Sequence, residues 1–224
     1  MRLERLDHVA LWVADRHAIA DFAVAHLGMH VIDETERFTL IGSNARRGKL
    51  TLFEAEGPRV PGALAAIGLR VNDVRQAMKA LPEGYGPEFE VAEGLRLRLV
   101  EAPTDVDYDL DHVAVLTTDP VAAAEQWQAL GFMPAPPKGD VVRVEVAGAF
   151  LELLRGQPRE QEQSLLNHLG VLVGSADEWR EQATTVGAEI ADVVDAPNTY
   201  AVFVWGPERV KLEYVEHKPG FSLE

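Results

Sequence analysis

Hydrophobic and polar residues follow one order four times along the chain. In each unit, a run in which branched and other apolar residues dominate, as in a strand, precedes a run with the spacing of an amphipathic helix. Shorter strand-like runs follow the helix, and turns with glycine, proline or charged residues separate them. A repeat of this length predicts four copies of one βαβββ module, because a single module can rarely bury its own apolar face.

Residues at the ends of the helical runs support these boundaries. Residues that commonly cap the start of a helix precede the four runs, namely Asp15, Asn72 or Asp73, Asp119 and Ser175. Residues that end helices follow the same runs, namely Gly28, Pro82, Gly131 and Gly187. The pattern therefore predicts an α+β protein in which four modules pair into two similar domains.

The first predicted strand of each module carries a recurring motif. The sequences LDHVAL at 6–11, LDHVAV at 110–115 and LNHLGV at 166–171 place His8, His112 and His168 at one position. The second module has LAAIGL at 64–69, with Ala66 where the others have histidine. One histidine in an apolar strand is usually a core residue, so it is the recurrence that indicates a function.

A glutamate recurs in the last predicted strand of the same modules. The sequences LFEA at 52–55, FLEL at 150–153 and KLEY at 211–214 align Glu54, Glu152 and Glu213, and the second module has Arg98 instead. Histidine and glutamate are therefore kept together or lost together. Burial of an unpaired carboxylate costs free energy. No basic residue repeats beside this glutamate, so a metal cation is its simplest partner.

The second half of the chain keeps a full set of two imidazoles and two carboxylates. We expect these four side chains to converge on one divalent ion such as Zn, Ni, Fe, Mn or Co. The predicted ligands are His112, Glu152, His168 and Glu213. The first half keeps only His8 and Glu54, which suits a scaffold or a lid better than a second metal centre.

An acidic stretch divides the chain near its middle. Residues 101–109 contain one proline and four carboxylates and have little to bury, so they predict a linker. The expected domains are residues 1–102, with a degenerate site, and residues 103–224, with the metal site.

The composition argues against several classes of function. A net charge of −15 disfavours binding to nucleic acid or to an anionic membrane surface, and no apolar run reaches the ~18 residues of a membrane span. The chain has no cysteine, so disulfides and thiolate nucleophiles are excluded and nitrogen and oxygen must hold any metal. The charged N-terminus is unlike a signal peptide, so we expect a cytoplasmic protein, as a monomer or a homodimer.

The module order and the quoted motifs resemble the vicinal oxygen chelate superfamily. This superfamily includes glyoxalase I, methylmalonyl-CoA epimerase, extradiol ring-cleaving dioxygenases, and bleomycin or fosfomycin resistance proteins. The resemblance extends over residues 3–217 and implies two glyoxalase/dioxygenase-like domains with curved mixed sheets. It also implies a small-molecule substrate that binds the metal through adjacent oxygens.

The resemblance leaves three functions open. The favoured one is a glyoxalase- or epimerase-type lyase or isomerase, in which four ligands hold the metal and Glu213 or Glu152 moves the proton as general base. An extradiol dioxygenase would hold Fe(II) or Mn(II) on His112, His168 and Glu213. Such dioxygenases leave three positions open, and Glu152 would fill one of them. The third function is a non-catalytic small-molecule-binding protein of the bleomycin resistance type.

Overall fold

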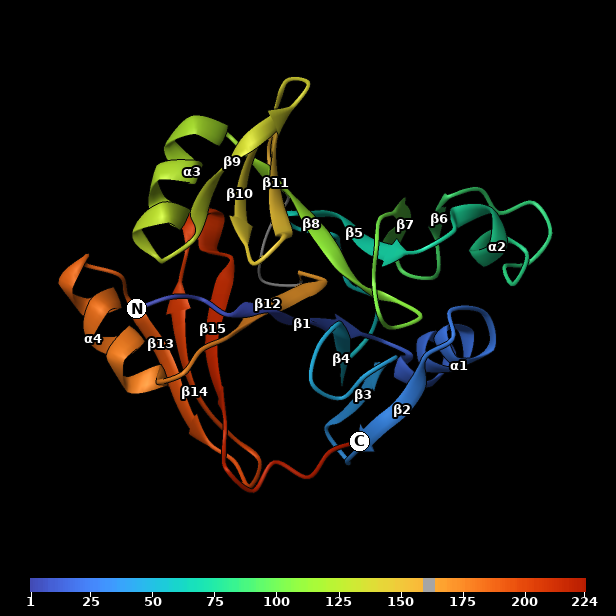
Figure 1. The fold of residues 1–224 in the computed structure, drawn as a ribbon, viewed down its shortest axis with the longest axis horizontal. Helices are drawn as coiled ribbons and strands as arrows, with labels where there is room; N and C mark the ends of the chain where they lie inside the picture. Colours follow the sequence, from blue (N-terminus) through green and yellow to red (C-terminus); the bar gives the residue numbers. More distant parts are fainter. Residues whose placement is uncertain (159–163) are drawn as a thin grey trace.

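The computed structural model describes residues 1–158 and 164–224, and it contains four modules (Figure 1). The first comprises β1 (Arg5–Val13), α1 (Arg16–His26), β2 (His30–Glu34), β3 (Phe38–Gly42) and β4 (Lys49–Glu54). The second comprises β5 (Leu64–Val71), α2 (Val74–Met78), β6 (Glu88–Glu90) and β7 (Arg96–Glu101). The third comprises β8 (Asp109–Thr117), α3 (Pro120–Ala129), β9 (Met133–Lys138), β10 (Val141–Val146) and β11 (Ala149–Arg155). The fourth comprises β12 (Leu166–Leu172), α4 (Ala176–Thr185), β13 (Ile190–Asp195), β14 (Thr199–Trp205), the short 3₁₀ helix η1 (Pro207–Arg209) and β15 (Lys211–His217).

The predicted helix starts are confirmed. The side chains of four residues accept hydrogen bonds from backbone N–H groups of the first helical turn, namely Asp15, Asp73, Asp119 and Ser175. The proline-rich residues 134–137 lie in β9. This strand is at the edge of its sheet, where missing N–H donors are tolerated.

The strands form two mixed, curved sheets, which confirms the predicted α+β class. The eight-stranded sheet has the order β13-β14-β15-β12-β1-β4-β3-β2, and the seven-stranded sheet has the order β6-β7-β5-β8-β11-β10-β9. Within the described residues, no helix is long and apolar enough to cross a membrane.

The modules pair differently from the expectation. The first module shares the eight-stranded sheet with the fourth through antiparallel pairing of β1 with β12. The second shares the other sheet with the third through antiparallel pairing of β5 with β8 (Figure 1). The expected division into residues 1–102 and 103–224 does not match this arrangement. The first strands of all modules have nearly the same apolar motif, so the motif alone does not select a partner.

Candidate metal centre

Three side chains from the first and fourth modules meet on the eight-stranded sheet. His8 lies on β1, His168 on its neighbour β12, and Glu213 on β15, which pairs with β12. The His8 and His168 Nε2 atoms are 3.0 Å apart, and Glu213 Oε2 lies 2.8 Å and 2.9 Å from them, respectively. All three residues are buried. The arrangement gathers donor atoms that could hold a metal ion.

The distances in this triangle fit a divalent ion. Two ligand atoms about 2.1 Å from a metal and at right angles to each other are about 3 Å apart, and all three sides of the triangle are close to this length. Glu213 Oε2 is buried, and both imidazole Nε2 atoms lie at ion-pair distance from it. An ion bound by all three residues would satisfy this oxygen.

A second layer of side chains orients the two imidazoles. His8 Nδ1 donates a hydrogen bond to Asp7, at 2.9 Å, and His168 Nδ1 donates one to Asn167, at 3.1 Å. When the rings are neutral, the hydrogen on each Nδ1 leaves the Nε2 lone pair toward the centre, as in metal-binding histidines. The buried ammonium of Lys49 lies 2.9 Å from Asp7 and balances its charge. The quoted motifs contained both Asp7 and Asn167, but their role was not foreseen.

The charges at the centre favour a cation. Burial lowers the pKa of His8, but the carboxylates of Glu213 and Asp7 outweigh burial and raise the pKa to about 9. Burial raises the pKa of Glu213, but His8 and His168 outweigh it and bring the pKa well below its usual value. Burial, helped by the charge of His8, lowers the pKa of His168 against the pull of Glu213. In the metal-free protein, the positive charge of the centre is therefore a proton on His8.

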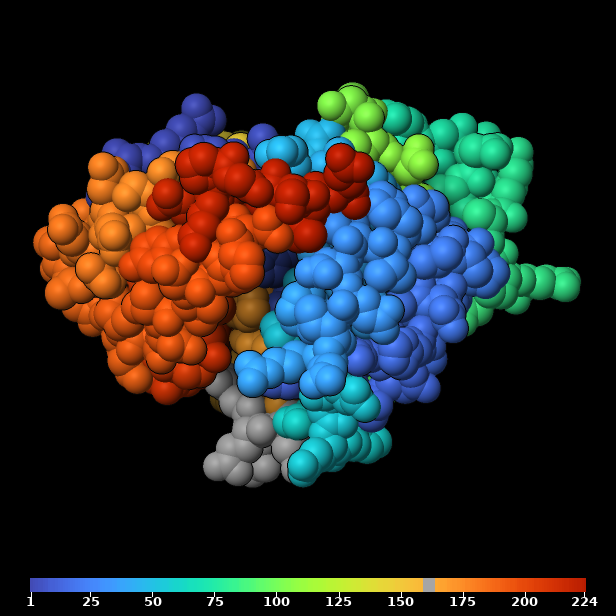
Figure 2. All heavy atoms as spheres, turned by 90° about the horizontal axis from the view of Figure 1, so that it is seen from below, coloured from blue at the N-terminus to red at the C-terminus, as the bar shows by residue number. Residues whose placement is uncertain are grey.

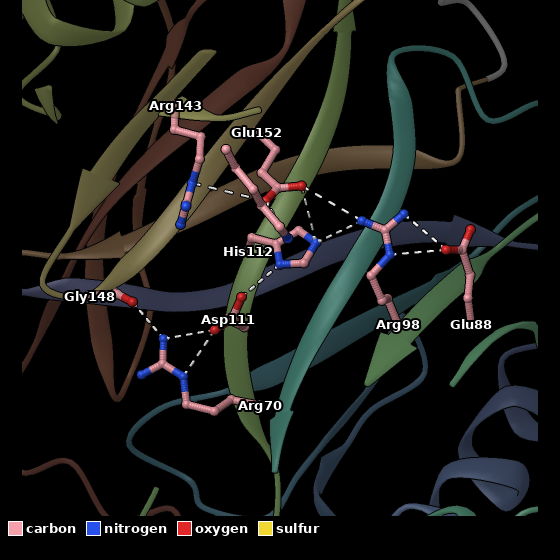
Figure 3. A network of polar contacts seen from close by, with 9 residues as sticks. Arg70, Glu88, Arg98, Asp111, His112, Arg143, Gly148 and Glu152 are labelled. Atoms are coloured by element: carbon pink, nitrogen blue, oxygen red, sulfur yellow. Dashed lines mark hydrogen bonds and ion pairs between the residues drawn. The ribbon is translucent and has the colours of Figure 1, made fainter. Parts of the chain in front are cut away.

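The four predicted ligands do not converge, because His112 and Glu152 lie on the other sheet (Figure 3). There the imidazole Nε2 is 3.6 Å from Glu152 Oε2, and Arg98 Nη1 lies 3.5 Å from the imidazole and 3.7 Å from the carboxylate. Lys138 and Arg143 also contact Glu152, at 3.2 Å and 4.0 Å, respectively. A guanidinium and two further cations thus balance this carboxylate, so this cluster does not resemble a metal centre.

Strand register corrects the alignment of the glutamates. Glu152 pairs with Ala114 and Glu213 with Gly170, which in each case is two residues after the recurring histidine. Arg98 is in the same position in the second module, opposite Gly68. In the first module, the equivalent residue is Thr51, opposite Ala10.

Glu54 is therefore not the equivalent of Glu213. It lies three residues further along β4, its side chain is 60% exposed, and it contacts Arg16. The first module contributes His8 and the neutral Thr51 to the centre, and the fourth contributes His168 and Glu213.

Glycine makes room for one imidazole in each module pair. A Cβ atom on Gly170 would lie 2.2 Å from Cε1 of His8, and a Cβ atom on Gly68 would lie 2.3 Å from the ring of His112. Both glycines belong to first strands that pair across the sheet with the strand of that histidine. The absence of a side chain at these positions lets the rings lie against the neighbouring backbone.

Aromatic side chains surround His168 on the same face of the sheet. The Phe53 and Phe203 rings lie 6.3 Å and 5.1 Å from the imidazole, and the Trp12 ring lies 5.2 Å from Phe53. Figure 2 shows a hollow between the first module, in blue, and the fourth, in orange and red. The surroundings of the centre therefore suit a planar apolar ligand better than a highly charged one.

Comparisons with known proteins agree with the fold. A family model described as the Glyoxalase/Bleomycin resistance protein/Dioxygenase superfamily matches residues 5–88. A structure from Bacillus subtilis described as a "putative dioxygenase" has a TM-score of 0.80 at 18% identity, over 98% of this chain and 87% of that chain. Glyoxalase I from Zea mays has a TM-score of 0.76 at 14% identity, over 95% of this chain and 92% of that chain.

A third similar structure is the cppA protein from Streptococcus pneumoniae, with a TM-score of 0.61 at 15% identity, over 96% of this chain and 98% of that chain. No curated protein sequence matches the chain. At these identities the solved structures establish the fold alone. With the family model over the first module and part of the second, they confirm the resemblance of this chain to the glyoxalase/bleomycin resistance/dioxygenase superfamily.

Proposed function

We propose that this protein is a metal-dependent dioxygenase that cleaves aromatic rings bearing two adjacent hydroxyls, with Fe(II) held by His8, His168 and Glu213. The observation that carries the proposal is the triangle of two imidazole nitrogens and one carboxylate oxygen. Two histidines and one carboxylate on one face of an octahedral ion are typical of non-haem Fe(II) oxygenases.

The number of ligands favours this function over a glyoxalase- or epimerase-type isomerase. An isomerase of that type would need four ligands, whereas Glu152 lies on the other sheet and Thr51 is at the strand position that corresponds to Glu213. Three ligands leave about three positions of an octahedral ion open, enough for two adjacent substrate oxygens and dioxygen. When bound, Fe(II) would supply Lewis acidity to the two hydroxyl oxygens and a path for electrons from the ring to dioxygen.

The side chains around the centre have separate roles in this proposal. Asp7 and Asn167 hold the two imidazoles with Nε2 toward the centre. Phe53 and Phe203 lie on the rim and would exclude water and pack against an aromatic ring. His8 holds a proton in the metal-free protein, with a pKa of about 9, and must release this proton when a metal binds.

The proposal is tested with metal-stripped protein reloaded anaerobically with Fe(II). Addition of catechol should cause uptake of dioxygen with loss of the aromatic absorbance. H168Q and E213Q should lose both iron binding and uptake, whereas H112Q should keep both, because His112 lies beside Arg98 on the other sheet. H112Q is a matched control, since His112 is as deeply buried and occupies the same position in the repeated motif.

Three results would contradict the proposal. One is equal iron binding by H168Q and the unaltered protein. Another is the absence of oxygen uptake with any vicinal diol, together with isomerisation of a hemithioacetal by the Zn- or Ni-loaded protein, which would restore the glyoxalase-type reaction. The third is failure to bind any divalent metal, which would favour a non-catalytic binding protein.

A further inference from the structure

A cavity of about 290 Å³ lies beside the metal centre. Its walls include two tryptophans and three cationic residues. The lining includes Trp12, Arg59, Trp205, Glu208, Arg209 and Lys211. Pockets for drug-sized ligands are about 300–1,000 Å³, so a cavity of this size suits one aromatic ring with small substituents.

The cavity adjoins the centre through shared side chains. Lys211 precedes Leu212, which pairs with Leu169, so Lys211 lies beside His168 on the neighbouring strand. The Lys211 ammonium lies 6.0 Å from the centroid of the Phe203 ring, and that ring lies 5.1 Å from the imidazole of His168. Trp12 contacts Phe53, and Phe53 contacts His168, so the aromatic wall is continuous with the centre.

Two of the cations in this wall have no anionic partner among the described residues. Arg209 forms an ion pair with Glu189 at 2.8 Å, but neither Lys211 nor Arg59 forms an ion pair within residues 1–158 and 164–224. The Lys211 ammonium lies 5.1 Å from the centroid of the Trp205 ring, and the Arg59 guanidinium lies 5.9 Å from that of Trp12. Among the described residues of the wall, the carboxylate is that of Glu208, which accepts hydrogen bonds from Thr117 and Thr118.

The side chains of Lys211 and Arg59 make the cavity wall positively charged, whereas the whole molecule is negatively charged. The chain carries a net charge of −15, so its overall field repels anions. Lys211 and Arg59, which have no anionic partner within residues 1–158 and 164–224, lie beside aromatic rings at one cavity and indicate a ligand that brings its own negative charge. An aromatic carboxylate meets both requirements, because its ring packs on the tryptophans and its oxygens accept hydrogen bonds from the cations.

We propose that the molecule bound at this centre is a single-ring aromatic carboxylate, with its carboxylate held by Lys211 and Arg59. The identification of two adjacent hydroxyls on the same ring rests on the proposed dioxygenase function. The recognition of the ring and the carboxylate rests on the cavity alone. On this basis, Lys211 and Arg59 determine specificity and do not take part in the reaction.

The test compares benzoate with benzamide, which have nearly the same shape but differ in charge. Isothermal titration calorimetry on metal-free protein measures binding without any reaction. We expect benzoate to bind at least about tenfold more tightly than benzamide. A charge-assisted hydrogen bond between its carboxylate and a cationic side chain is worth at least this difference in affinity. K211M should remove most of this preference, K211R should keep it, and K79M should leave it unchanged, since Lys79 is an exposed lysine on the second module.

Equal affinities for benzoate and benzamide would overturn the proposal, as would a preference that survives in K211M. The latter result would place the carboxylate at another cation, such as the protonated His8. A second measurement separates this proposal from the proposed reaction. In the Fe(II)-loaded protein, K211M should raise the KM for 3,4-dihydroxybenzoate about tenfold with little change in kcat, and should leave the KM for 3,4-dihydroxybenzamide unchanged.

The two proposals can fail separately. If benzoate is preferred through Lys211 but no catechol supports oxygen uptake, the aromatic anion site stands and the dioxygenase function fails. If oxygen is taken up equally well with charged and neutral catechols, the dioxygenase function stands and the carboxylate site fails.

Discussion

Substitution of Gly170 by alanine tests whether His8 is a metal ligand. A Cβ atom at this position would lie 2.2 Å from Cε1 of His8, 2.5 Å from Nδ1 and 2.7 Å from Nε2. These are the atoms of the ring itself, in a buried residue that is also held by Asp7. The imidazole therefore cannot remain in its present position when the methyl group is added.

The size of the required movement sets the expected effect. Ordinary contact begins at 3.4 Å, so the ring must move by 3.4 − 2.2 = 1.2 Å unless the backbone yields. Metal–ligand distances tolerate only about 0.2 Å, so His8 would no longer reach an ion held by His168 and Glu213. We expect at least about a hundredfold loss of metal affinity, or about 2.7 kcal/mol. Overpacking should also cost about 1–3 kcal/mol of folding stability.

The control for this experiment is G68A. The added Cβ would lie 2.3 Å from the ring of His112, so the steric conflict and the loss of stability should be similar. Because His112 belongs to the cluster around Arg98, metal affinity should not change. Affinity is measured by competition with a chromophoric chelator, and stability by thermal unfolding of the metal-free proteins.

Two results would refute the reasoning. If G170A keeps the metal affinity of the unaltered protein while unfolding at a lower temperature, His8 is not a ligand. If G68A loses metal to the same extent as G170A, the loss reflects a general loosening of both sheets.

Two further predictions concern charge. Because the folded-state pKa of His8 is raised from 6.5 to about 9, its protonation stabilises the metal-free protein fully below pH 6.5, and this stabilisation is lost as the pH rises through 9. Thermal unfolding should therefore show a decline in the melting temperature of the metal-free protein across this range, and H8Q should lack it. The double variant A66H/R98T would give the second module pair the same set of residues as the first, and atomic absorption after dialysis should find two metal ions per chain. One ion per chain would contradict this expectation.

Local signals in the sequence predicted the modules but not their pairing. Helix caps and the alternation of apolar residues are properties of single segments, so they could be recognised in one module at a time. The choice of partner depends on which first strands lie side by side, and these strands carry almost the same residues in all modules. We expected adjacent modules in each half to pair. This expectation therefore predicted His112, and not His8, as the neighbour of His168.

The sequence also did not predict the register of the last strand in the first module. A search for a recurring glutamate aligned Glu54 with Glu213, although the strand pairing places Thr51 in that position. The alignment of apolar neighbours supports the observed register, since residues 49–52, 96–99, 150–153 and 211–214 all have leucine at the second position. Giving weight to these leucines would have identified Thr51, because core positions of a strand tolerate fewer changes of size than exposed ones.

The positive charge beside each buried carboxylate distinguishes the two module pairs more clearly than the number of ligands does. Both Glu152 and Glu213 are buried next to an imidazole, and burial of a carboxylate requires a compensating charge. Glu152 has the guanidinium of Arg98 for this purpose, supplied by the module that lost its histidine (Figure 3). Among the described residues, the groups at ion-pair distance from Glu213 are two imidazoles, one of which must be protonated to supply charge. With Ala66 and Arg98 in the second module, one module pair carries its own cation, and the other pair remains suited to a metal ion.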